Sequence, residues 1–324
     1  MLNTPILLII FNRPETTKKV FEVIREARPV KLFIAADGPR KGILKDEENC
    51  HQARNIVSLI DWPCEVKTLF QNDNLGCSFG PRAAFNWFFS HEPEGIILED
   101  DCLPDVSFFN YCSILLEKYR EDDRIISING SNLGYELSDG NSYTFSRFMN
   151  MWGWATWRRS ADLIDYEVKE WLKIKKPVQK LYKVLRQNIF DSDINWYKYW
   201  KDKFDRTANN KDKTWWDWQW IYYQIMNKKY SIVPSVNLVT NIGFSENATH
   251  TKEYNNPASG IKNNKIGFPL IHPSKINPDI LYEEKFVKWV WCYHKRLPTS
   301  FYIKRILKKS LKRLSRPNKA PVKN

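Results

Sequence analysis

Apolar segments alternate with helical segments through the first 130 residues of this 324-residue chain, and this alternation constrains the fold most. Five segments have the apolar content of buried strands, namely 6–11, 30–39, 64–71, 95–101 and 124–132. Helical spacing or a helix-starting proline marks the segments between them, which we expect at 14 onward, 46–60, 81–90 and 104–119. The pattern predicts an α/β fold with a Rossmann-like, mainly parallel sheet and helices on both faces.

Polar side chains follow three of the expected strands. These are Asn12-Arg13 after the first strand, Asp37-Gly38 after the second and Glu99-Asp100-Asp101 after the fourth. Ligands of parallel sheets bind outside the carboxyl ends of the strands. We therefore expect the three groups to meet at one crevice.

The acidic triplet 99–101 needs a counter-charge. Adjacent carboxylates repel one another by about 1 kcal/mol per pair at 4 Å in water. A hard divalent cation would offset this repulsion, and oxygen ligands suit Mg²⁺ and Mn²⁺. In an alternative interpretation, Asp105 caps the following helix and the acids favour its positive end. Capping does not explain three acids before Asp105, so the sequence predicts a metal site with Mn²⁺ or Mg²⁺ as cofactor.

The segments "PILLIIFNRPE", "GIILEDD" and "PDVSFFNYCSILLEKYREDDRIISINGSN" resemble the nucleotide-sugar half of GT-A glycosyltransferases. The resemblance is closest to the inverting N-acetylglucosaminyltransferase I-like group and its bacterial relatives, in which an acidic triplet replaces the DXD motif. It covers residues 4–135 and continues more weakly through "WGWATW", "WWDWQW" and "NIGFSENATHT". It implies the GT-A fold and a nucleotide-diphosphate sugar as donor. The membrane anchor and stem that Golgi members carry are missing, which favours a bacterial cytoplasmic enzyme.

The resemblance assigns roles to residues at the strand ends. Asp101 would be the direct metal ligand, with Asp100 and Glu99 toward the ribose and the donor sugar. Arg13 would meet the diphosphate, although it could also be an ordinary surface arginine. Asp37 would accept a hydrogen bond from the nucleobase, and it is also a turn-forming residue before glycine.

Three further residues complete the expected donor-binding set. Asn12 lies beside Arg13 at the end of the first strand, and Arg82 follows the "NLGCSFG" loop and could reach a phosphate. Trp154 could stack on a sugar. Clustered tryptophans such as Trp152, Trp154 and Trp157 are also expected to lie at least partly in the core.

An inverting transfer needs a carboxylate that takes the proton of the acceptor hydroxyl. Asp217 in "TWWDWQW" matches the base of the resembled group, and Glu246 is a second candidate. The spacing from Thr214 to Asp217 also fits a capping box at a helix start, which is compatible with the catalytic role. His250 in "NATHT" would add a metal or phosphate contact, although a lone histidine is more often structural.

These assignments divide the chain into three parts. Residues 1–255 would form the GT-A catalytic domain, with the nucleotide-sugar half at 1–135 and the acceptor half at 136–255. A helical insertion is expected at about 160–210, inside the acceptor half. Residues 256–294 would be a C-terminal extension and residues 295–324 a basic amphipathic tail.

The composition is that of a globular protein, with 43% hydrophobic and 15% aromatic residues. Most of the formal charge of +13 comes from the tail, because residues 295–324 hold 11 of the 50 Lys and Arg residues and no acid. The rest of the chain has 39 basic and 37 acidic residues and is nearly neutral. The six cysteines show neither a CxxC pair nor zinc-ligand spacing, which favours a reduced cytosolic protein. The apolar run Ile6–Phe11 is too short for a membrane span or a signal peptide.

The tail contains an amphipathic helical pattern at 301–314. Apolar residues at 303, 306, 307, 311 and 314 face away from a Lys/Arg face. Each basic residue near an anionic membrane surface contributes about 1 kcal/mol, so the pattern predicts a peripheral protein on the inner face of the plasma membrane. A helix packed on the body or a nucleic-acid contact are alternatives that charge alone does not exclude. No helix-turn-helix, RNA-binding or P-loop signature is present, and we expect no nucleic-acid partner.

The expected function is therefore that of a metal-dependent, inverting glycosyltransferase. It would move a hexosyl or N-acetylhexosaminyl group from a nucleotide-diphosphate sugar, for which we expect a UDP-sugar, to a saccharide or lipid-linked acceptor in bacterial surface polysaccharide or glycolipid synthesis. One alternative is a nucleotidyltransferase of related fold, although the expected Gly-rich, Lys-containing loop is missing after Phe11. The other is a non-catalytic membrane- or nucleic-acid-binding protein that acts through the tail.

Overall fold

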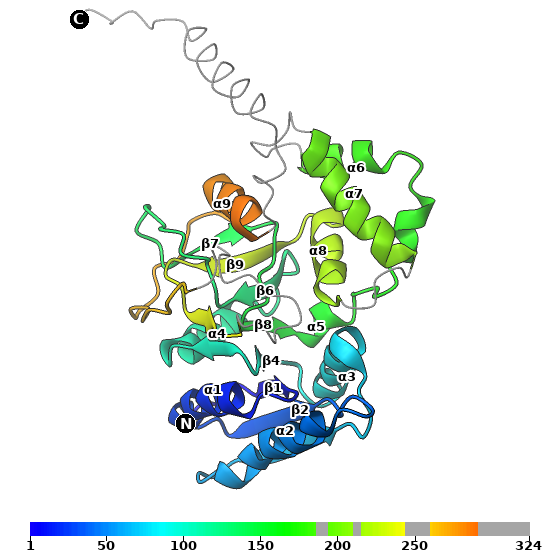
Figure 1. Cartoon of the computed structure of the whole chain (residues 1–324). Helices are drawn as coiled ribbons and strands as arrows, with labels where there is room; N and C mark the ends of the chain where they lie inside the picture. Colours follow the sequence, from blue (N-terminus) through cyan, green and yellow to red (C-terminus); the bar gives the residue numbers. More distant parts are fainter. Residues whose placement is uncertain (186–193, 210–214, 244–259, 291–324) are drawn as a thin grey trace, which may run out of the picture.

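Eight strands form one mixed sheet in the order β3-β2-β1-β4-β8-β6-β9-β7. A computed structural model describes residues 1–185, 194–209, 215–243 and 260–290 of the chain (Figure 1). The strands of this sheet are β1 (Ile6–Ile10), β2 (Lys31–Ala36), β3 (Glu65–Phe70), β4 (Glu94–Glu99), β6 (Ile125–Asn129), β7 (Tyr143–Ser146), β8 (Trp154–Trp157) and β9 (Tyr230–Pro234). The pairs β3-β2, β2-β1, β1-β4 and β6-β9 are parallel. The prediction of a mainly parallel α/β sheet is confirmed.

Two strands depart from the expected pattern. β8 runs antiparallel to both β4 and β6, and β7 runs antiparallel to β9. The sequence analysis treated "WGWATW" as an aromatic motif and not as a strand. All four residues of β8 are buried, so a central antiparallel strand carries the same continuous apolar signal as its parallel neighbours.

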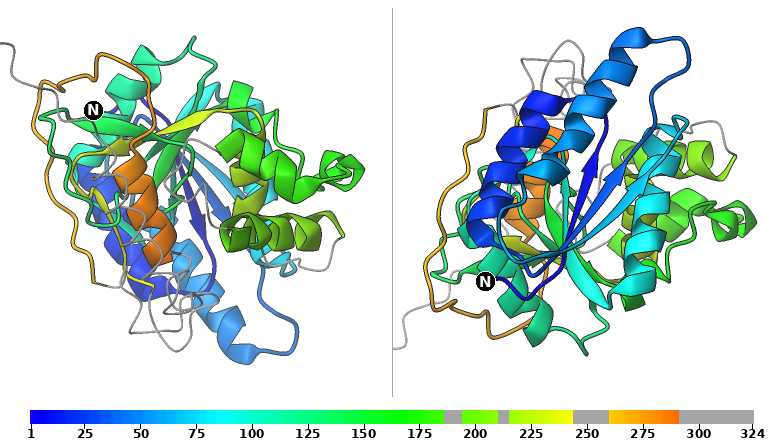
Figure 2. Two further views of the ribbon diagram at one scale, coloured as in Figure 1. Left: turned by 90° about the horizontal axis from the view of Figure 1, so that it is seen from above. Right: turned by 90° about the horizontal axis from the view of Figure 1, so that it is seen from below.

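The sheet separates two apolar cores because side chains alternate across each strand. Leu7 of β1 packs into one core, whereas Ile6, Leu8 and Ile10 pack into the other. Figure 2 shows α1 and α2 on one side of the sheet and α3 with the α6–α8 group on the other. The helices are α1 (Pro14–Ala27), α2 (Leu44–Arg54), α3 (Gly76–His91), α4 (Ser107–Lys118), α5 (Arg158–Ala161), α6 (Pro177–Leu185), α7 (Ile194–Ala208), α8 (Asp217–Met226) and α9 (Ile280–Val290), with 3₁₀ turns η1 (Asn55–Leu59) and η2 (Lys169–Lys173).

The third helix begins earlier than predicted. α3 starts at Gly76 and contains Pro81, which the sequence analysis took as the first residue of the helix. A proline inside a helix removes one backbone hydrogen bond, so its presence normally indicates a start. Here the backbone N–H groups of Leu75 and Gly76 donate to the carboxylate of Asp37, and this contact fixes the earlier start.

A small second sheet follows the acidic triplet. β5 (Cys102–Pro104) pairs antiparallel with β10 (Val239–Asn241), so the next helix, α4, begins at Ser107 and not at Pro104. The expected capping contact of Asp105 is present, since its carboxylate accepts hydrogen bonds from the backbone N–H and hydroxyl of Ser107. Through β5 and β10, residues 241–243 are brought against Asp101.

The described part of the 160–210 stretch is helical, with η2, α6 and α7 (Figure 1). The tail at 301–314 lies outside the described residues. Among the residues that are described, no helix is both long and apolar enough to cross a membrane.

Candidate functional site

Arg13 and the acidic triplet meet at the carboxyl edge of β1 and β4. These strands are parallel neighbours with Ile9 opposite Glu99, so their ends emerge together. Nη1 of Arg13 lies 2.7 Å from Oδ2 of Asp101 and 3.5 Å from Oδ1 of Asp100. The backbone N–H of Phe11 donates to Oδ2 of Asp100 at 3.0 Å. The predicted convergence of these two strand ends is thus present.

Burial and the neighbouring charges raise the pKa of two carboxylates of the triplet, those of Glu99 and Asp100. Burial, followed by the charges of Asp101 and Asp100, raises the pKa of Glu99 to about 8. The pKa of Asp100 is raised to about 7, chiefly by burial and against the opposing effect of Arg13. The pKa of Arg13 is raised despite its burial, because Asp100 and Asp101 favour its charged form. Arg13 therefore supplies part of the positive charge that the triplet requires.

Asp217 adds a fourth carboxylate from the opposite half of the sequence. It is the first residue of α8, and its Oδ1 is buried without a hydrogen-bond partner among the described residues. Burial raises its pKa to about 6. Its charge also contributes to the raised pKa of Glu99, which places it within electrostatic reach of the triplet. Thr214, the expected capping partner, lies outside the described residues.

Gly243 is a part of the site that the sequence analysis missed. The backbone N–H of Ile242 donates to the carbonyl oxygen of Asp101 at 2.8 Å. A Cβ atom on residue 243 would lie 2.1 Å from Oδ2 of Asp101, so no residue other than glycine fits this position. The glycine in "NIGF" was the available signal, but only the pairing of β5 with β10 shows what it approaches.

The carboxylate oxygens of this site are compatible with a divalent cation that is also bound by the phosphates of a substrate. Among the described residues, no three His, Cys, Asp or Glu side chains are arranged to hold a metal by themselves. Mg²⁺ in phosphate-transfer sites commonly takes only one or two carboxylates and completes its shell with water and substrate phosphates. Asp101 at the strand end suits that mode. His250, the other expected metal ligand, lies outside the described residues. Glu246, the second candidate for the general base, also lies outside them.

Asp37 has a different set of partners from those expected. Its Oδ1 accepts hydrogen bonds from the backbone N–H groups of Gly38 and Leu75, both at 2.8 Å. Its Oδ2 accepts from Gly76 at 2.9 Å and from the side chain of Asn74 at 3.0 Å. A carboxylate has about four acceptor positions, and all four are used. The structure thus supports the turn-forming role, and a nucleobase would have to displace one of these donors.

The remaining expected donor-binding residues are placed as follows. Asn12 donates to Oδ1 of Asp46 at 2.7 Å and so ties the end of β1 to α2. The guanidinium of Arg82 lies over the ring of Tyr166, 4.4 Å from its centroid. Trp154 is 1% exposed and packs edge-to-face on Trp220, so it belongs to the aromatic core and offers no open face to a sugar.

No protein-family model matches the sequence, and no curated protein matches it either. The chain is similar in part to several solved structures. HddC from Yersinia pseudotuberculosis is 10% identical, with 48% of this chain and 77% of that chain covered and a TM-score of 0.30. Mannosyltransferase PcManGT from Pyrobaculum calidifontis, solved with GDP-Man and Mn²⁺, is 8% identical, with 53% and 47% covered and a TM-score of 0.32.

Mouse xyloside xylosyltransferase 1 is 11% identical, with 68% of this chain and 81% of that chain covered and a TM-score of 0.28. Scores this low do not establish a common fold. The α/β fold described above rests on the strand order and pairing of this chain itself.

Proposed function

We propose that the chain is a glycosyltransferase of the GT-A type that uses a nucleotide-diphosphate sugar and inverts the anomeric centre. The observation that carries the proposal is the contact of Arg13 with Asp100 and Asp101 at the carboxyl edge of the sheet, with Asp217 within electrostatic reach of the adjacent Glu99. Arg13 provides a cation, Asp101 provides a hard oxygen ligand, and Asp217 provides a carboxylate with a buried oxygen that has no partner among the described residues. A diphosphate leaving group and an acceptor hydroxyl require such a combination.

Arg13 would bind the diphosphate of the donor. Its guanidinium presents several N–H donors in a planar arrangement that matches phosphate oxygens. Asp101 would hold Mn²⁺ or Mg²⁺, and the bound ion would neutralise charge on the leaving diphosphate. Glu99 and Asp100 would face the ribose and the donor sugar, as the sequence resemblance implies.

Asp217 would act as the general base. An effective base has a pKa near the working pH, and burial brings the pKa of Asp217 to about 6. Its Oδ1 is free of hydrogen bonds in the described part of the chain, so it could accept the proton of an acceptor hydroxyl. The backbone N–H groups of Asp217 and Trp218, at the start of α8, favour the charged form of this carboxylate and partly oppose the effect of burial on its pKa.

The finer parts of the proposal concern the substrates. We expect a UDP-sugar as donor and a saccharide or lipid-linked acceptor, within the synthesis of a bacterial surface polysaccharide or glycolipid. An anionic membrane surface bound by residues 301–314 would bring the enzyme to a lipid-linked acceptor on the inner face of the plasma membrane. We also propose that the chain is a member of the N-acetylglucosaminyltransferase I-like group.

The test compares the two reactions that this type of sheet can support. The protein is incubated with Mn²⁺ and nucleotide-diphosphate sugars, with candidate acceptors, and release of nucleoside diphosphate is measured. In parallel it is given nucleoside triphosphates with sugar 1-phosphates, and release of pyrophosphate is measured. We expect release of nucleoside diphosphate only, lost in Asp217→Asn and retained in the exposed control Asp123→Asn. Pyrophosphate release without transfer would establish the nucleotidyltransferase alternative instead.

A further inference from the structure

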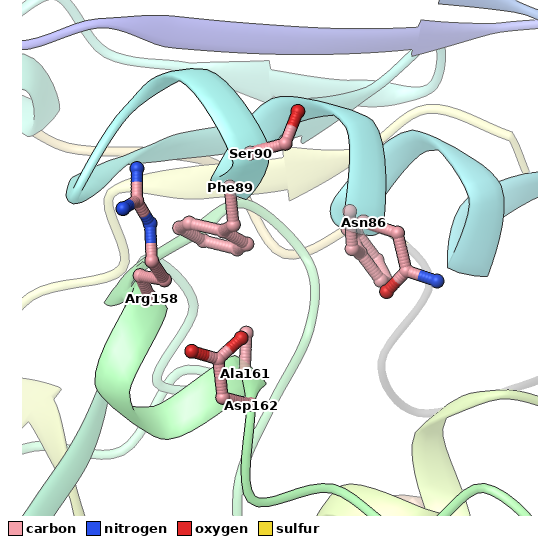
Figure 3. Close-up of a pocket in the computed structure, with 7 residues that line it drawn as sticks. Asn86, Phe89, Ser90, Arg158, Ala161 and Asp162 are labelled. Atoms are coloured by element: carbon pink, nitrogen blue, oxygen red, sulfur yellow. The ribbon is translucent and has the colours of Figure 1, made fainter.

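A cavity of about 390 Å³ lies between α3 and α5, away from the carboxylate cluster. Its walls come from Phe85, Asn86 and Phe89 of α3 and from Arg158 and Asp162 at α5 (Figure 3). This volume falls within the range of small-molecule sites, roughly 300–1,000 Å³. The backbone N–H of Arg158 donates to the carbonyl oxygen of Pro93, just before β4 begins. The cavity is therefore at the amino edge of β4, whereas Asp101 follows its carboxyl edge.

Three polar side chains that line this cavity, those of Asn86, Arg158 and Asp162, have no hydrogen-bond partner among the described residues, whereas the hydroxyl of Ser90 donates to the carbonyl oxygen of Trp87. Within the described ranges, the guanidinium of Arg158 makes no hydrogen bond or ion pair, and its Nε is fully buried. The carboxylate of Asp162 and the side-chain amide of Asn86 also have no protein partner among the described residues, and both residues are exposed at the mouth of the cavity, so only the Arg158 Nε is a buried group without a partner. A buried N–H without a partner is unfavourable, so an occupant that accepts hydrogen bonds from Arg158 would be stabilised there.

A second cavity provides a useful contrast. It has about 340 Å³ and is also lined by charged residues at the amino edge. Its charges are paired, however, because Lys31 lies 2.8 Å from Glu92 and Arg120 lies 2.8 Å from Glu94. The unpaired groups of the α3–α5 cavity are therefore not a general property of charged surface hollows in this protein.

We propose that the α3–α5 cavity binds a small polyhydroxylated anion, namely a sugar acid or a sugar phosphate. The anionic group would accept hydrogen bonds from the guanidinium of Arg158, which suits both carboxylate and phosphate. The carboxylate of Asp162 would repel a second anionic group on the ligand but would accept hydrogen bonds from its hydroxyls. The side-chain amide of Asn86 would both donate hydrogen bonds to those hydroxyls and accept hydrogen bonds from them. Phe85 and Phe89 supply the apolar part of the wall, as the C–H groups of a sugar require.

The proposal does not depend on the function proposed for the carboxylate cluster. Binding is measured calorimetrically with the full chain, using D-glucuronate and D-glucose 6-phosphate as probes and D-glucose and inorganic phosphate as controls. We expect saturable binding of at least one acidic sugar, at least about tenfold tighter than either control, since a charge-assisted contact and the hydroxyl contacts are each needed. Comparing glucuronate with glucose 6-phosphate shows which anionic group is preferred.

Variants identify the site of binding. Arg158→Gln should lower the affinity for the acidic sugar at least about tenfold, and Asp162→Asn should lower this affinity to a smaller extent. Arg120→Gln, in the other cavity, and Asp101→Asn, in the carboxylate cluster, should leave the affinity unchanged. The Arg158 guanidinium has no hydrogen bond to lose, so Arg158→Gln should keep the wild-type circular dichroism spectrum and melting temperature.

Several results would overturn the proposal. These are no saturable binding of either acidic sugar, unchanged affinity in a folded Arg158→Gln protein, or equal affinity for inorganic phosphate alone. Loss of binding in Asp101→Asn would likewise overturn it, because the sugar would then occupy the carboxylate cluster.

Discussion

The buried carboxylate of Asp217, for which we propose the role of general base, lowers the stability of the folded protein when it is ionised. Its pKa in the folded protein is about 6, above its ordinary value of 3.8, because burial disfavours the charged form. The folded state is therefore penalised by the ionised carboxylate. This penalty is absent at pH values below the unfolded pKa, grows between about 4 and 6, and is complete above that range.

Asp217→Asn should accordingly raise the free energy of unfolding at pH 8 by up to about 3 kcal/mol, because one pKa unit corresponds to about 1.4 kcal/mol. Near pH 4 the same substitution should change stability little. Glycosyl transfer should fall at least about 100-fold, within the usual contribution of a general base. Urea denaturation at both pH values and an activity assay test this expectation, and a loss of stability at pH 8 would contradict it.

The pH dependence of the reaction follows from the same group. We expect kcat/KM to fall about tenfold per pH unit below about pH 6, as protonation of Asp217 removes the base from the free enzyme. The measurement is an initial-rate profile between pH 5 and 8 at saturating Mn²⁺. A profile that stays flat down to pH 5 would show that a group other than Asp217 takes the proton.

At the scale of elements, Asp37 joins the end of β2 to the start of α3. Asp37→Ala removes the acceptor of three backbone N–H groups, those of Gly38, Leu75 and Gly76. We expect a loss of about 2–4 kcal/mol in the free energy of unfolding, by analogy with the removal of a helix cap and of charge-assisted hydrogen bonds. Hydrogen exchange should accelerate selectively at residues 74–80.

The control is Asp73→Ala, in the same loop, for which the structure shows no side-chain hydrogen bond among the described residues. It should leave both stability and exchange close to wild type. If Asp37→Ala changed only donor binding and not the exchange of 74–80, Asp37 would be a nucleobase contact and not the residue that fixes this turn.

The elements of the N-terminal half were predictable because each strand there is a short apolar run between helical segments. The same reasoning failed at β8, since a buried strand such as "WATW" has no signal for its direction. It also failed at Pro81, because the helix start depends on Asp37, which is far away in the sequence.

The site was partly predictable for a topological reason. The ends of β1 and β4 had to lie at one edge of a parallel sheet, so the convergence of Arg13 and the acidic triplet followed from the strand assignments, whereas their direct ion pair was not predicted. The partners of Asp37 and the close approach of Gly243 to Asp101 could not be foreseen. The first depends on the loop at 74–76, which reaches Asp37 only once β2 and β3 have paired, and the second depends on the pairing of β10 with β5.

At the scale of the whole molecule, the charge is concentrated in one terminal segment. Removing residues 295–324 would leave 39 basic and 37 acidic residues. The truncated protein should lose binding to vesicles that contain anionic lipid, because each basic residue near such a surface contributes about 1 kcal/mol. Vesicle sedimentation measures the binding, and neutral vesicles are the control. Transfer to a soluble acceptor should persist, and its loss on truncation would show that the tail serves the active site directly.

We have proposed that the edge formed by Arg13, Asp100 and Asp101 binds a nucleotide-diphosphate sugar. The most direct test of this proposal is thermal unfolding with a panel of nucleotide sugars, with and without Mn²⁺, for the wild type and for Asp101→Asn. A ligand at 100 times its Kd should stabilise the folded state by about 2.7 kcal/mol. We predict a Mn²⁺-dependent rise in melting temperature with one class of donor, abolished in Asp101→Asn. No shift with any donor, in a protein shown to be folded, would contradict the claim.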